Sequence, residues 1–321
     1  MTQATGNERI AVLIPALNEE QTIADVVHAF RAALPNARII VFDNASTDGT
    51  SPRARAAGAE VRLEQRRGKG NVVQSMFRSI DADVYVMVDG DATYPADRVE
   101  DLIAPIVNGT ADMVIGSRLL HGTESDFRAL NRMGNVFYAT LLRSLFRSRI
   151  TDLLSGYRAF SRRLVKTLPL LGGGFETEAE MTIKAVHRGF RVVEVPVSLV
   201  SRPEGSKSKI RVVQDGWLIL NAIVSLFRDY KPLTFFGVFA LLLAASAGGA
   251  WFFGYPLVAA TLAVIAAAAA ATGAVLHTVT RHFQEMEAQL ERMIGDRLQQ
   301  EEDSEVRKGE GRQLREIRPS P

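Results

Sequence analysis

Residues 84–95 read VYVMVDGDATYP, an apolar run that stops at a cluster of acidic and turn-forming residues. A short apolar run rich in β-branched residues and bounded by turn signals is typical of a strand buried in a sheet. Similar runs occur at 10–14, 38–42, 59–63 and 112–115, and amphipathic stretches typical of helices occur near 20–34, 70–80 and 96–107. This alternation of strands and helices predicts an α/β fold with a mostly parallel, doubly wound sheet.

Polar clusters follow four of the predicted strands. PALNEE begins at residue 15, DNASTDGT at residue 43, DGDATYP at residue 89 and GSR at residue 116. Sheets of this kind bind their ligands in the crevice beyond the carboxyl ends of the strands. The sequence therefore predicts that the four clusters converge on one site.

The motif Asp89-Gly90-Asp91 places two carboxylates one residue apart at a strand end, with a glycine between them that lets the backbone turn. Mg²⁺ takes one or two protein carboxylates and completes its shell with water and substrate phosphates. We therefore interpret Asp89 and Asp91 as ligands of a divalent cation, Mg²⁺ or Mn²⁺, that binds together with a diphosphate.

The composition excludes several classes of protein. The 321 residues include 38 Lys and Arg against 36 Asp and Glu, a net charge of +2, and 47% are hydrophobic. Disordered chains have low hydrophobicity, and simple nucleic-acid-binding domains usually have a strong basic excess, so we expect neither disorder nor a nucleic-acid partner. The chain has no cysteine, which excludes a disulfide framework and a thiolate metal site.

Between residues 232 and 280 the sequence contains no Asp, Glu, Lys or Arg. A bilayer span needs about 20 apolar residues, and 233–254 and 256–280 each supply one. Basic residues flank this hairpin, its turn is uncharged, and no signal peptide begins the chain, which places both ends inside. We therefore expect an integral protein of the plasma (inner) membrane, with its N-terminal domain and both termini in the cytoplasm.

The soluble part carries an ordered set of motifs: LIPALNEEQTI at 13–23, VFDNASTDGT at 41–50, RGKG at 67–70, VDGDATYP at 88–95, GSR at 116–118, DLLSGYRAF at 152–160 and GFETEAE at 174–180. Together they resemble family 2 glycosyltransferases with the GT-A fold. RPEGSKSKI at 202–210 and the apolar hairpin after it resemble the polyprenyl-phosphate glycosyltransferases, which include dolichyl-phosphate mannose and glucose synthases. The resemblance implies transfer of a sugar from a nucleotide-sugar donor to undecaprenyl or dolichyl phosphate.

The resemblance also implies roles for single residues. Those matched to donor nucleotide-sugar binding are Pro15, Ala16, Asn18, Glu19, Asp43, Lys69, Asp89, Gly90 and Glu178. Asp91 is matched to the principal metal ligand, with Asp89 on the ribose or metal side of the donor. Thr93 stands where mannosyl-phosphate synthases often have a glutamine ligand, and Ala16-Leu17 replaces their Thr-Tyr. Both departures favour a UDP-sugar over GDP-mannose.

The acceptor site is predicted from a concentration of arginine. Residues 118–163 hold nine arginines against three acidic residues. An exposed helix face is one interpretation; the other is a phosphate site facing an anionic membrane, because arginine makes bidentate phosphate contacts and each basic residue near anionic lipid contributes about 1 kcal/mol. The resemblance matches Arg118 and Arg132 to acceptor-phosphate binding, and places Arg202, Lys207 or Lys209 in a loop that closes over the phosphate.

A polyprenyl phosphate needs little deprotonation, because the second pKa of a phosphate monoester is about 6. We therefore expect direct, inverting displacement by a phosphate oxygen, with Asp91, Asp152, Arg118 and Arg132 in catalytic roles. Asp152 matches a position that serves as general base in family members with hydroxyl acceptors. With a phosphate acceptor, its expected role is to orient Arg158 or Arg132.

These inferences divide the chain into four parts: a GT-A domain at 1–200, a flexible loop and juxtamembrane amphipathic helix at 201–231, two transmembrane helices at 232–280, and a cytoplasmic helix with a disordered tail at 281–321. The amphipathic helix suits the headgroup layer of a membrane. Small residues at 248–250 permit close helix contact, so a homo-oligomer is a further expectation.

Two alternatives stay open: a glycosyltransferase with a non-lipid acceptor, and a membrane-anchored protein that binds nucleotide sugars without turnover. Other classes are disfavoured. A processive polysaccharide synthase would carry a Gln-x-x-Arg-Trp motif, and an NAD-binding protein would carry Gly-x-Gly-x-x-Gly after the first strand. Neither motif occurs at the corresponding place in this sequence.

Overall fold

The computed structural model describes residues 9–119, 129–174, 176–200 and 212–316. The chain divides into two compact units, one ending at Leu226 and the other beginning at Phe227. The first unit contains the sheet and the polar clusters that follow its strands. The second contains the two long apolar helices.

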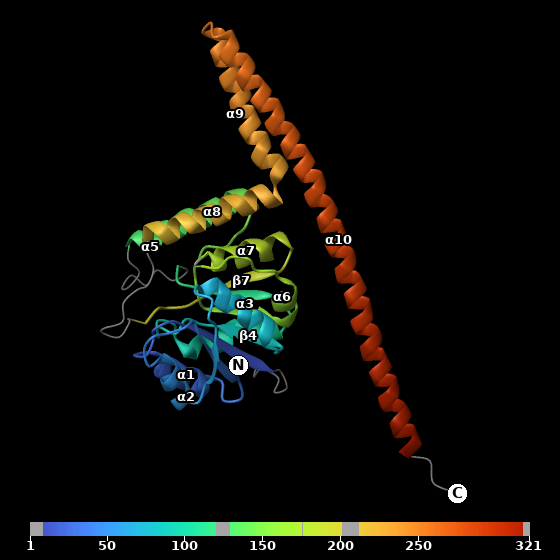
Figure 1. The fold of residues 1–321 in the computed structure, drawn as a ribbon. Coiled ribbons are helices and arrows are strands. Elements are labelled where there is room, and N and C mark those ends of the chain that lie inside the picture. Colours follow the sequence, from blue (N-terminus) through green and yellow to red (C-terminus); the bar gives the residue numbers. More distant parts are fainter. Residues whose placement is uncertain (1–8, 120–128, 175, 201–211, 317–321) are drawn as a thin grey trace. The chain divides into compact units, whose positions relative to one another are not determined.

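The described part of the first unit forms one seven-stranded sheet in the order β3-β2-β1-β4-β6-β5-β7 (Figure 1). The strands are β1 Ile10–Ala16, β2 Arg38–Asp43, β3 Glu60–Leu63, β4 Val84–Met87, β5 Met113–Ser117, β6 Arg158–Ser161 and β7 Val192–Pro196. Only β6 runs antiparallel to its neighbours, β4 and β5. The predicted mostly parallel α/β fold is confirmed. Sequence periodicity missed both β6, a short strand that begins with an arginine, and β7, whose apolar run is interrupted by Glu194.

Helices cover both faces of the sheet because adjacent residues of a buried strand point to opposite sides. Before residue 200, the described α-helices of this unit are α1 Ile23–Ala33, α2 Thr50–Ala56, α3 Lys69–Ser79, α4 Val99–Val107, α5 Ala129–Phe146, α6 Arg162–Thr167 and α7 Thr177–His187. Val12 and Ile14 pack with the buried faces of α1, α2 and α4 in one core cluster. On the other face α3 contacts α6 and α7.

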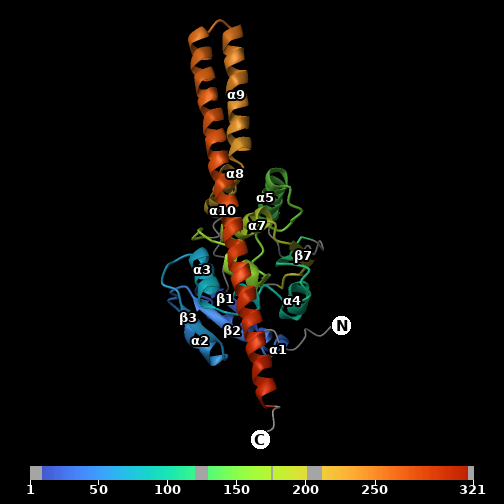
Figure 2. The same cartoon turned by 90° about the vertical axis from the view of Figure 1, so that its right-hand side faces the viewer.

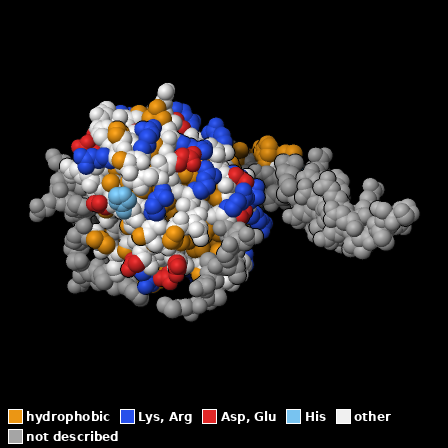
Figure 3. Space-filling view, turned by 90° about the horizontal axis from the view of Figure 1, so that it is seen from below, with side chains coloured by type: hydrophobic (Ala, Val, Ile, Leu, Met, Phe, Trp, Pro, Cys, Tyr) orange, Lys and Arg blue, Asp and Glu red, His pale blue; other side chains and the backbone are white. Residues whose placement is uncertain are grey.

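Helix α8, Val212–Tyr230, lies beside α5 (Figure 1). Tyr138 Oη of α5 donates a hydrogen bond of 2.8 Å to the Gly216 carbonyl of α8. Large apolar side chains remain exposed on both helices, including Phe137 at 55% and Trp217 at 69%. By contrast, the face seen in Figure 3 mixes basic, acidic and single apolar side chains, which is the usual surface of a domain in water.

The second unit is a helical hairpin. Helix α9, Pro232–Phe252, and helix α10, Pro256–Glu316, run side by side (Figure 2), and the turn between them contains Gly254 at a φ of 81°. Both helices are long and apolar enough to cross a membrane, over Pro232–Phe252 and Pro256–Met286. Helix α10 continues past residue 300, where the sequence predicted a disordered tail. Glu, Gln, Arg and Lys, which dominate that stretch, are strong helix formers.

Candidate active site

The loops after β1, β2 and β4 each contain a non-glycine residue in the left-handed region of backbone space. Asn18 has a φ of 51°, Ala45 of 55° and Ala92 of 58°. This conformation costs roughly 1–2 kcal/mol for most residues with a side chain, and such strain clusters at functional sites. Since β2, β1 and β4 are neighbours in the sheet, the strain marks one shared edge, the one where the sequence predicts a site.

At this edge the end of β1 lies beside the end of β2. Pro15 and Ala16 are in register with Phe42 and Asp43. The Asp43 carboxylate is buried, with 4% of the residue exposed. It accepts hydrogen bonds from the Ser46 N–H at 2.9 Å and from Ser51 Oγ at 2.5 Å. Asp43 therefore holds a fixed orientation next to the residues matched to donor binding.

Reciprocal hydrogen bonds join the loops that follow β1 and β2. The Asn18 N–H donates to Ser46 Oγ at 2.9 Å, and Asn18 Oδ1 accepts from the Thr47 N–H at 2.8 Å. The Glu19 N–H donates to Thr50 Oγ1 at 2.8 Å. The backbone of the PALNEE segment is thus held by the DNASTDGT segment, so the two predicted clusters form one surface.

The acidic motif lies at the end of β4, beside β1. Thr22 Oγ1 donates to the Gly90 carbonyl at 2.7 Å, which ties the motif to the loop after β1. Asp91 is 8% exposed, and its Oδ1 accepts from the Thr93 N–H at 3.2 Å and from Thr93 Oγ1 at 2.6 Å. Thr93 therefore orients the Asp91 carboxylate.

Lys69, the first residue of α3, bridges two carboxylates. Its Nζ lies 2.6 Å from Asp89 Oδ1 and 2.5 Å from Glu178 Oε1. Burial by itself would lower the pKa of Lys69, but the two carboxylates outweigh it and raise that pKa above its ordinary value. Within the described residues, the buried Oε2 of Glu178 has no hydrogen-bond partner. The site thus keeps a charged lysine and an unsatisfied acceptor.

Glycines allow the first turn of α3 to reach this position. The Gly70 N–H donates to the Gly173 carbonyl at 3.1 Å. A side chain at Gly68 or Gly70 would collide with the carbonyl oxygens of Gly173 and Gly172. The glycines of the RGKG motif therefore allow a close backbone contact, and this contact places Lys69 between Asp89 and Glu178.

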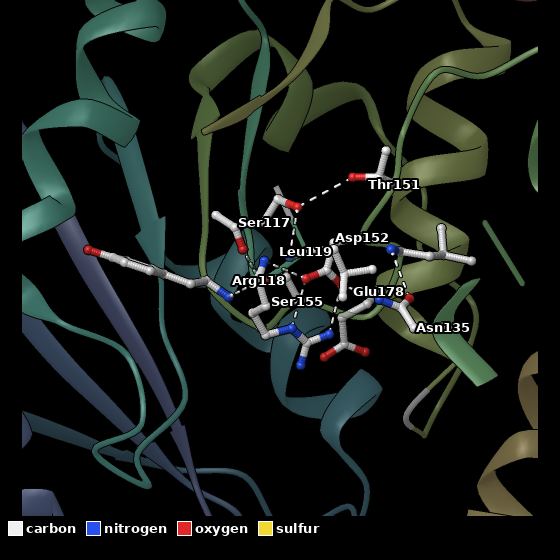
Figure 4. Close-up of polar contacts among 12 residues, drawn as sticks. Ser117, Arg118, Leu119, Asn135, Thr151, Asp152, Ser155 and Glu178 are labelled. Atoms are coloured by element: carbon white, nitrogen blue, oxygen red, sulfur yellow. Dashed lines mark hydrogen bonds and ion pairs between the residues drawn. The ribbon is translucent and has the colours of Figure 1, made fainter. Parts of the chain in front are cut away.

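Arg118, at the end of β5, forms a bidentate ion pair with Asp152 (Figure 4). The Arg118 Nε and Nη2 atoms donate to Asp152 Oδ2 and Oδ1, both at 2.7 Å, and the Arg118 N–H donates to Oδ2 at 2.9 Å. Asn135 Nδ2 donates to Oδ1 at 2.8 Å. Asp152 is 0% exposed. The sequence suggested Arg158 or Arg132 as the partner of Asp152, whereas the structure pairs it with Arg118.

The protonation states of this pair are fixed by its own charges. Burial would raise the pKa of Asp152, but Arg118 outweighs that effect and holds the pKa below its ordinary value. For Arg118, burial acts to lower the pKa, while Tyr94 and Asp152 raise it above the ordinary value. The pair is therefore an ionised arginine with an ionised aspartate at neutral pH.

Three residues that the sequence did not single out support this pair. Glu194 of β7 accepts from the Thr151 N–H at 3.0 Å and from the Asp152 N–H at 2.7 Å. Asn135 of α5 accepts from the Leu153 N–H at 3.1 Å, besides donating to Asp152. Tyr94 Oη accepts from the Gly156 N–H at 3.0 Å. Of the three, only Tyr94 lies in one of the ordered sequence motifs, VDGDATYP at 88–95.

Some of the predicted acceptor residues lie outside the described part of the chain. Arg202, Lys207 and Lys209 fall in the segment 201–211, which is not described. Arg132 belongs to α5, but its side chain is not described. Of the residues matched to acceptor phosphate, only Arg118 can be placed at the site.

The carboxylates after β4 fit a divalent cation. Carboxylate oxygen is a hard ligand of the kind that Mg²⁺ and Mn²⁺ prefer, and Thr93 fixes Asp91. In the ranges that the structure describes, no group of three or more His, Cys, Asp and Glu side chains could hold a metal ion. A cation bound by Asp91 and Asp89 would take its remaining ligands from water and substrate phosphates.

Residues 11–168 match the family model described as glycosyl transferase family 2. The chain is 34% identical over 231 residues to glycosyltransferase AglJ of Haloferax volcanii, covering 72% of this chain and 76% of that relative. It is 30% identical over 231 residues to a dolichyl-phosphate hexose transferase of the same organism, covering 72% of this chain and 99% of that relative.

A solved structure is similar as well. It is glucosyl-3-phosphoglycerate synthase from Mycobacterium tuberculosis in complex with Mn²⁺, UDP-glucose and glycerol 3-phosphate. The TM-score is 0.56 at 25% identity, and the match covers 70% of this chain and 81% of that one. The resemblance read from the motifs is confirmed, because the family model, the relatives and the fold agree: the chain belongs to glycosyl transferase family 2.

Proposed function

We propose that this glycosyltransferase transfers a sugar from a nucleotide-sugar donor, a UDP-sugar in preference to GDP-mannose, to a polyprenyl phosphate at the cytoplasmic face of a membrane. Support comes from the dolichyl-phosphate hexose transferase, 99% of whose length is covered at 30% identity. The similar structure that holds Mn²⁺ and UDP-glucose supports the donor class and the metal. The two apolar helices support a membrane location.

The hydrogen bonds and the pKa of Asp152 favour a phosphate over a hydroxyl as the acceptor group. A hydroxyl acceptor needs a general base within hydrogen-bond reach of its proton. Asp152, the matched position, is 0% exposed, and both of its oxygens accept hydrogen bonds from Arg118. Its pKa is held below the ordinary value, with Arg118 opposing the effect of burial. An acceptor phosphate, mostly dianionic at neutral pH, needs no such base.

At the donor end we assign nucleotide-sugar binding to a set of residues that converge after β1, β2 and β4 and at the starts of α3 and α7. They are Pro15, Ala16, Asn18, Glu19, Asp43, Lys69, Asp89, Gly90 and Glu178. Lys69 supplies positive charge beside Asp89. Oε2 of Glu178, which has no partner among the described residues, accepts a hydrogen bond from a hydroxyl of the transferred sugar. Such an acceptor stays costly until it is satisfied.

The reaction is a direct displacement. A phosphate oxygen of the acceptor attacks the anomeric carbon opposite the leaving nucleotide diphosphate, so the new C–O bond forms as the old one breaks and the configuration inverts. A divalent cation at Asp91 and Asp89 supplies charge neutralisation for the leaving diphosphate. The acceptor phosphate is held in line by Arg118, Arg132, Arg202 and Lys207 or Lys209.

The membrane side of the first unit is assigned to α5 and α8. Met133 is 68% exposed, Phe137 55% and Trp217 69%. Large apolar side chains on adjacent helices suit the headgroup and acyl boundary of a bilayer. The hairpin of α9 and α10 spans the membrane, and the flanking basic residues place both termini in the cytoplasm.

Association through α9 is a further part of the proposal. Side chains added at Gly248 and Gly249 would meet nothing within 4 Å in a single chain. Small residues on a lipid-facing helix permit close approach of a second helix. Crosslinking of the protein in native membranes tests this association, and a wholly monomeric product contradicts it.

The function is tested with full-length protein reconstituted in vesicles with Mg²⁺ and undecaprenyl phosphate. A panel of UDP- and GDP-sugars is added, and sugar entering the lipid phase is followed. We expect one productive UDP-sugar and no product from the Asp91→Asn variant. Release of nucleotide diphosphate without lipid product would indicate a non-lipid acceptor, and binding of a donor without any turnover would indicate a binding protein.

A further inference from the structure

Arg158 is a buried cation that the proposed reaction does not use. It begins β6 and is 0% exposed. Within the part of the chain that the structure describes, its guanidinium forms no ion pair but donates three hydrogen bonds to neutral oxygens. Nε donates to the Ser155 carbonyl at 2.8 Å, Nη2 to the Leu153 carbonyl at 2.7 Å, and Nη1 to Thr182 Oγ1 at 2.8 Å.

A cation in this position is costly. Burial lowers the pKa of Arg158 below its ordinary value, as expected when a charge leaves water. An apolar side chain of similar volume would avoid the desolvation penalty. What an apolar side chain cannot supply is a rigid, planar set of donors, which arginine presents in a fixed geometry. A buried arginine at position 158 is therefore explained by a role that requires this donor geometry.

The two carbonyl groups that Arg158 holds belong to the loop 152–157. At one end of this loop Asp152 binds Arg118 through two hydrogen bonds of 2.7 Å. Near the other end Gly156 packs so closely on Asp89 that a side chain at this position would collide with the Asp89 carboxylate. The loop thus connects the arginine at the acceptor end of the site with the acidic motif at the donor end.

Each end of the loop is also anchored independently of Arg158. Glu194 accepts from the Asp152 N–H at 2.7 Å, and Asn135 accepts from the Leu153 N–H at 3.1 Å. Tyr94 Oη accepts from the Gly156 N–H at 3.0 Å. Loss of Arg158 would therefore leave both ends attached and would release the segment between them, whose Leu153 and Ser155 carbonyl groups it holds.

We infer that Arg158 is a positioning residue: by holding the carbonyl oxygens of Leu153 and Ser155 in one fork of donors, it sets the distance between the Arg118–Asp152 pair and Asp89. The inference rests on the proposed function for its assignment of an acceptor end and a donor end. In-line displacement requires the two ends to be in register, and an error of about 1 Å in such positioning costs on the order of 10²-fold in rate.

The test compares Arg158→Lys with Thr182→Val in the full-length protein, reconstituted with undecaprenyl phosphate and the productive donor. Lysine keeps the charge but presents its donors from one nitrogen on a flexible stem, and so lacks the rigid planar fork that fixes both carbonyl groups. Valine at position 182 removes a hydrogen bond to the same guanidinium, together with the Thr182 Oγ1 hydrogen bond to the Glu178 carbonyl within α7, without touching the loop. We expect Arg158→Lys to lower kcat by roughly 30-fold or more, with the KM of both substrates changed by less than about 3-fold.

Thr182→Val is expected to lower Tm but to keep kcat within about 3-fold of wild type. Equal losses of kcat in the two variants would overturn the inference, since the effect would then be a general loss of stability. A change confined to the donor KM would also overturn it, because that pattern reports uniform binding. A folded Arg158→Lys variant with wild-type kcat would overturn the inference as well.

Tyr94→Phe keeps the inference testable if Arg158→Lys does not fold. It removes the hydrogen bond that anchors the Gly156 end of the loop, without exposing a buried charge. We expect kcat to fall roughly 10-fold with both KM values unchanged, and an unchanged kcat would overturn the positioning role of this loop. Failure of the proposed function is visible separately, in wild-type protein that makes no lipid product with any donor. That result would contradict both the proposed function and the positioning role of Arg158.

Discussion

Oε1 of Glu178 lies 2.5 Å from the ammonium nitrogen of Lys69, with 4% and 12% of the two side chains exposed. The contact joins the first turn of α7 to the first residue of α3, two elements far apart in the chain. It also leaves Oε2 of Glu178 as a buried acceptor without a partner among the described residues. The ion pair therefore shapes the donor end of the site and retains a group that a sugar hydroxyl can satisfy.

Replacement of Lys69 by methionine should strongly destabilise the protein. It leaves the Asp89 and Glu178 carboxylates close together without their counter-ion, and breaking a buried pair from one side typically costs about 3–5 kcal/mol. Adding Glu178→Gln should restore part of that loss, because the two sites are directly coupled. Thermal unfolding of wild type and of the single and double variants measures the coupling, and simple additivity would contradict a direct ion pair.

Asp91→Asn and Asp152→Asn should separate in their effects on turnover. The first removes the principal metal ligand and should abolish detectable transfer. The second removes a group that holds Arg118 but takes no proton, so we expect turnover to fall but to stay measurable, with an unchanged pH profile. The pH profile of lipid-linked sugar formation, followed from roughly pH 4 to pH 9, is the measurement. An acidic limb that is present in wild type and lost in the Asp152→Asn profile would show that Asp152 is a base.

Ala92→Gly should stabilise the fold. Ala92 has a φ of 58°, a conformation that glycine adopts without the steric cost that alanine carries. We expect a gain of roughly 0.5–1 kcal/mol in the free energy of unfolding. Ala29→Gly, on the exposed side of α1, is the matched control and should lose a similar amount, because glycine in a helix is unfavourable. Chemical denaturation measures the change in the free energy of unfolding for both variants. A loss of stability in Ala92→Gly as well as in Ala29→Gly would argue against strain at Ala92.

Trp217 should report contact with lipid. The chain has two tryptophans, Trp217 and Trp251, so a Trp251→Phe variant leaves the exposed residue of α8 as the single probe. We expect its fluorescence to be quenched by lipids brominated near the headgroup more than by lipids brominated deep in the acyl chains. Equal, weak quenching at both depths would place α8 in water and remove its proposed membrane contact.

Much of the plan of this protein is determined by its sequence. Apolar runs that stop at acidic and turn-forming clusters placed β1, β2, β4 and β5 and brought their loops to one edge of the sheet. The uncharged stretch at 232–280 gave the helical hairpin. Both signals are local, because periodicity and the absence of charge report how each segment meets water or apolar surroundings.

Tertiary structure decided which charged groups pair. Asp152 binds Arg118, Lys69 meets Glu178, and β6 enters the sheet antiparallel with a buried arginine at its start. Each of these contacts joins segments that are distant in sequence, and a charged side chain gives the same local signal whether it is exposed or buried with a partner. Only the packing of the chain removes these groups from water, and that removal makes the choice of partner energetically decisive.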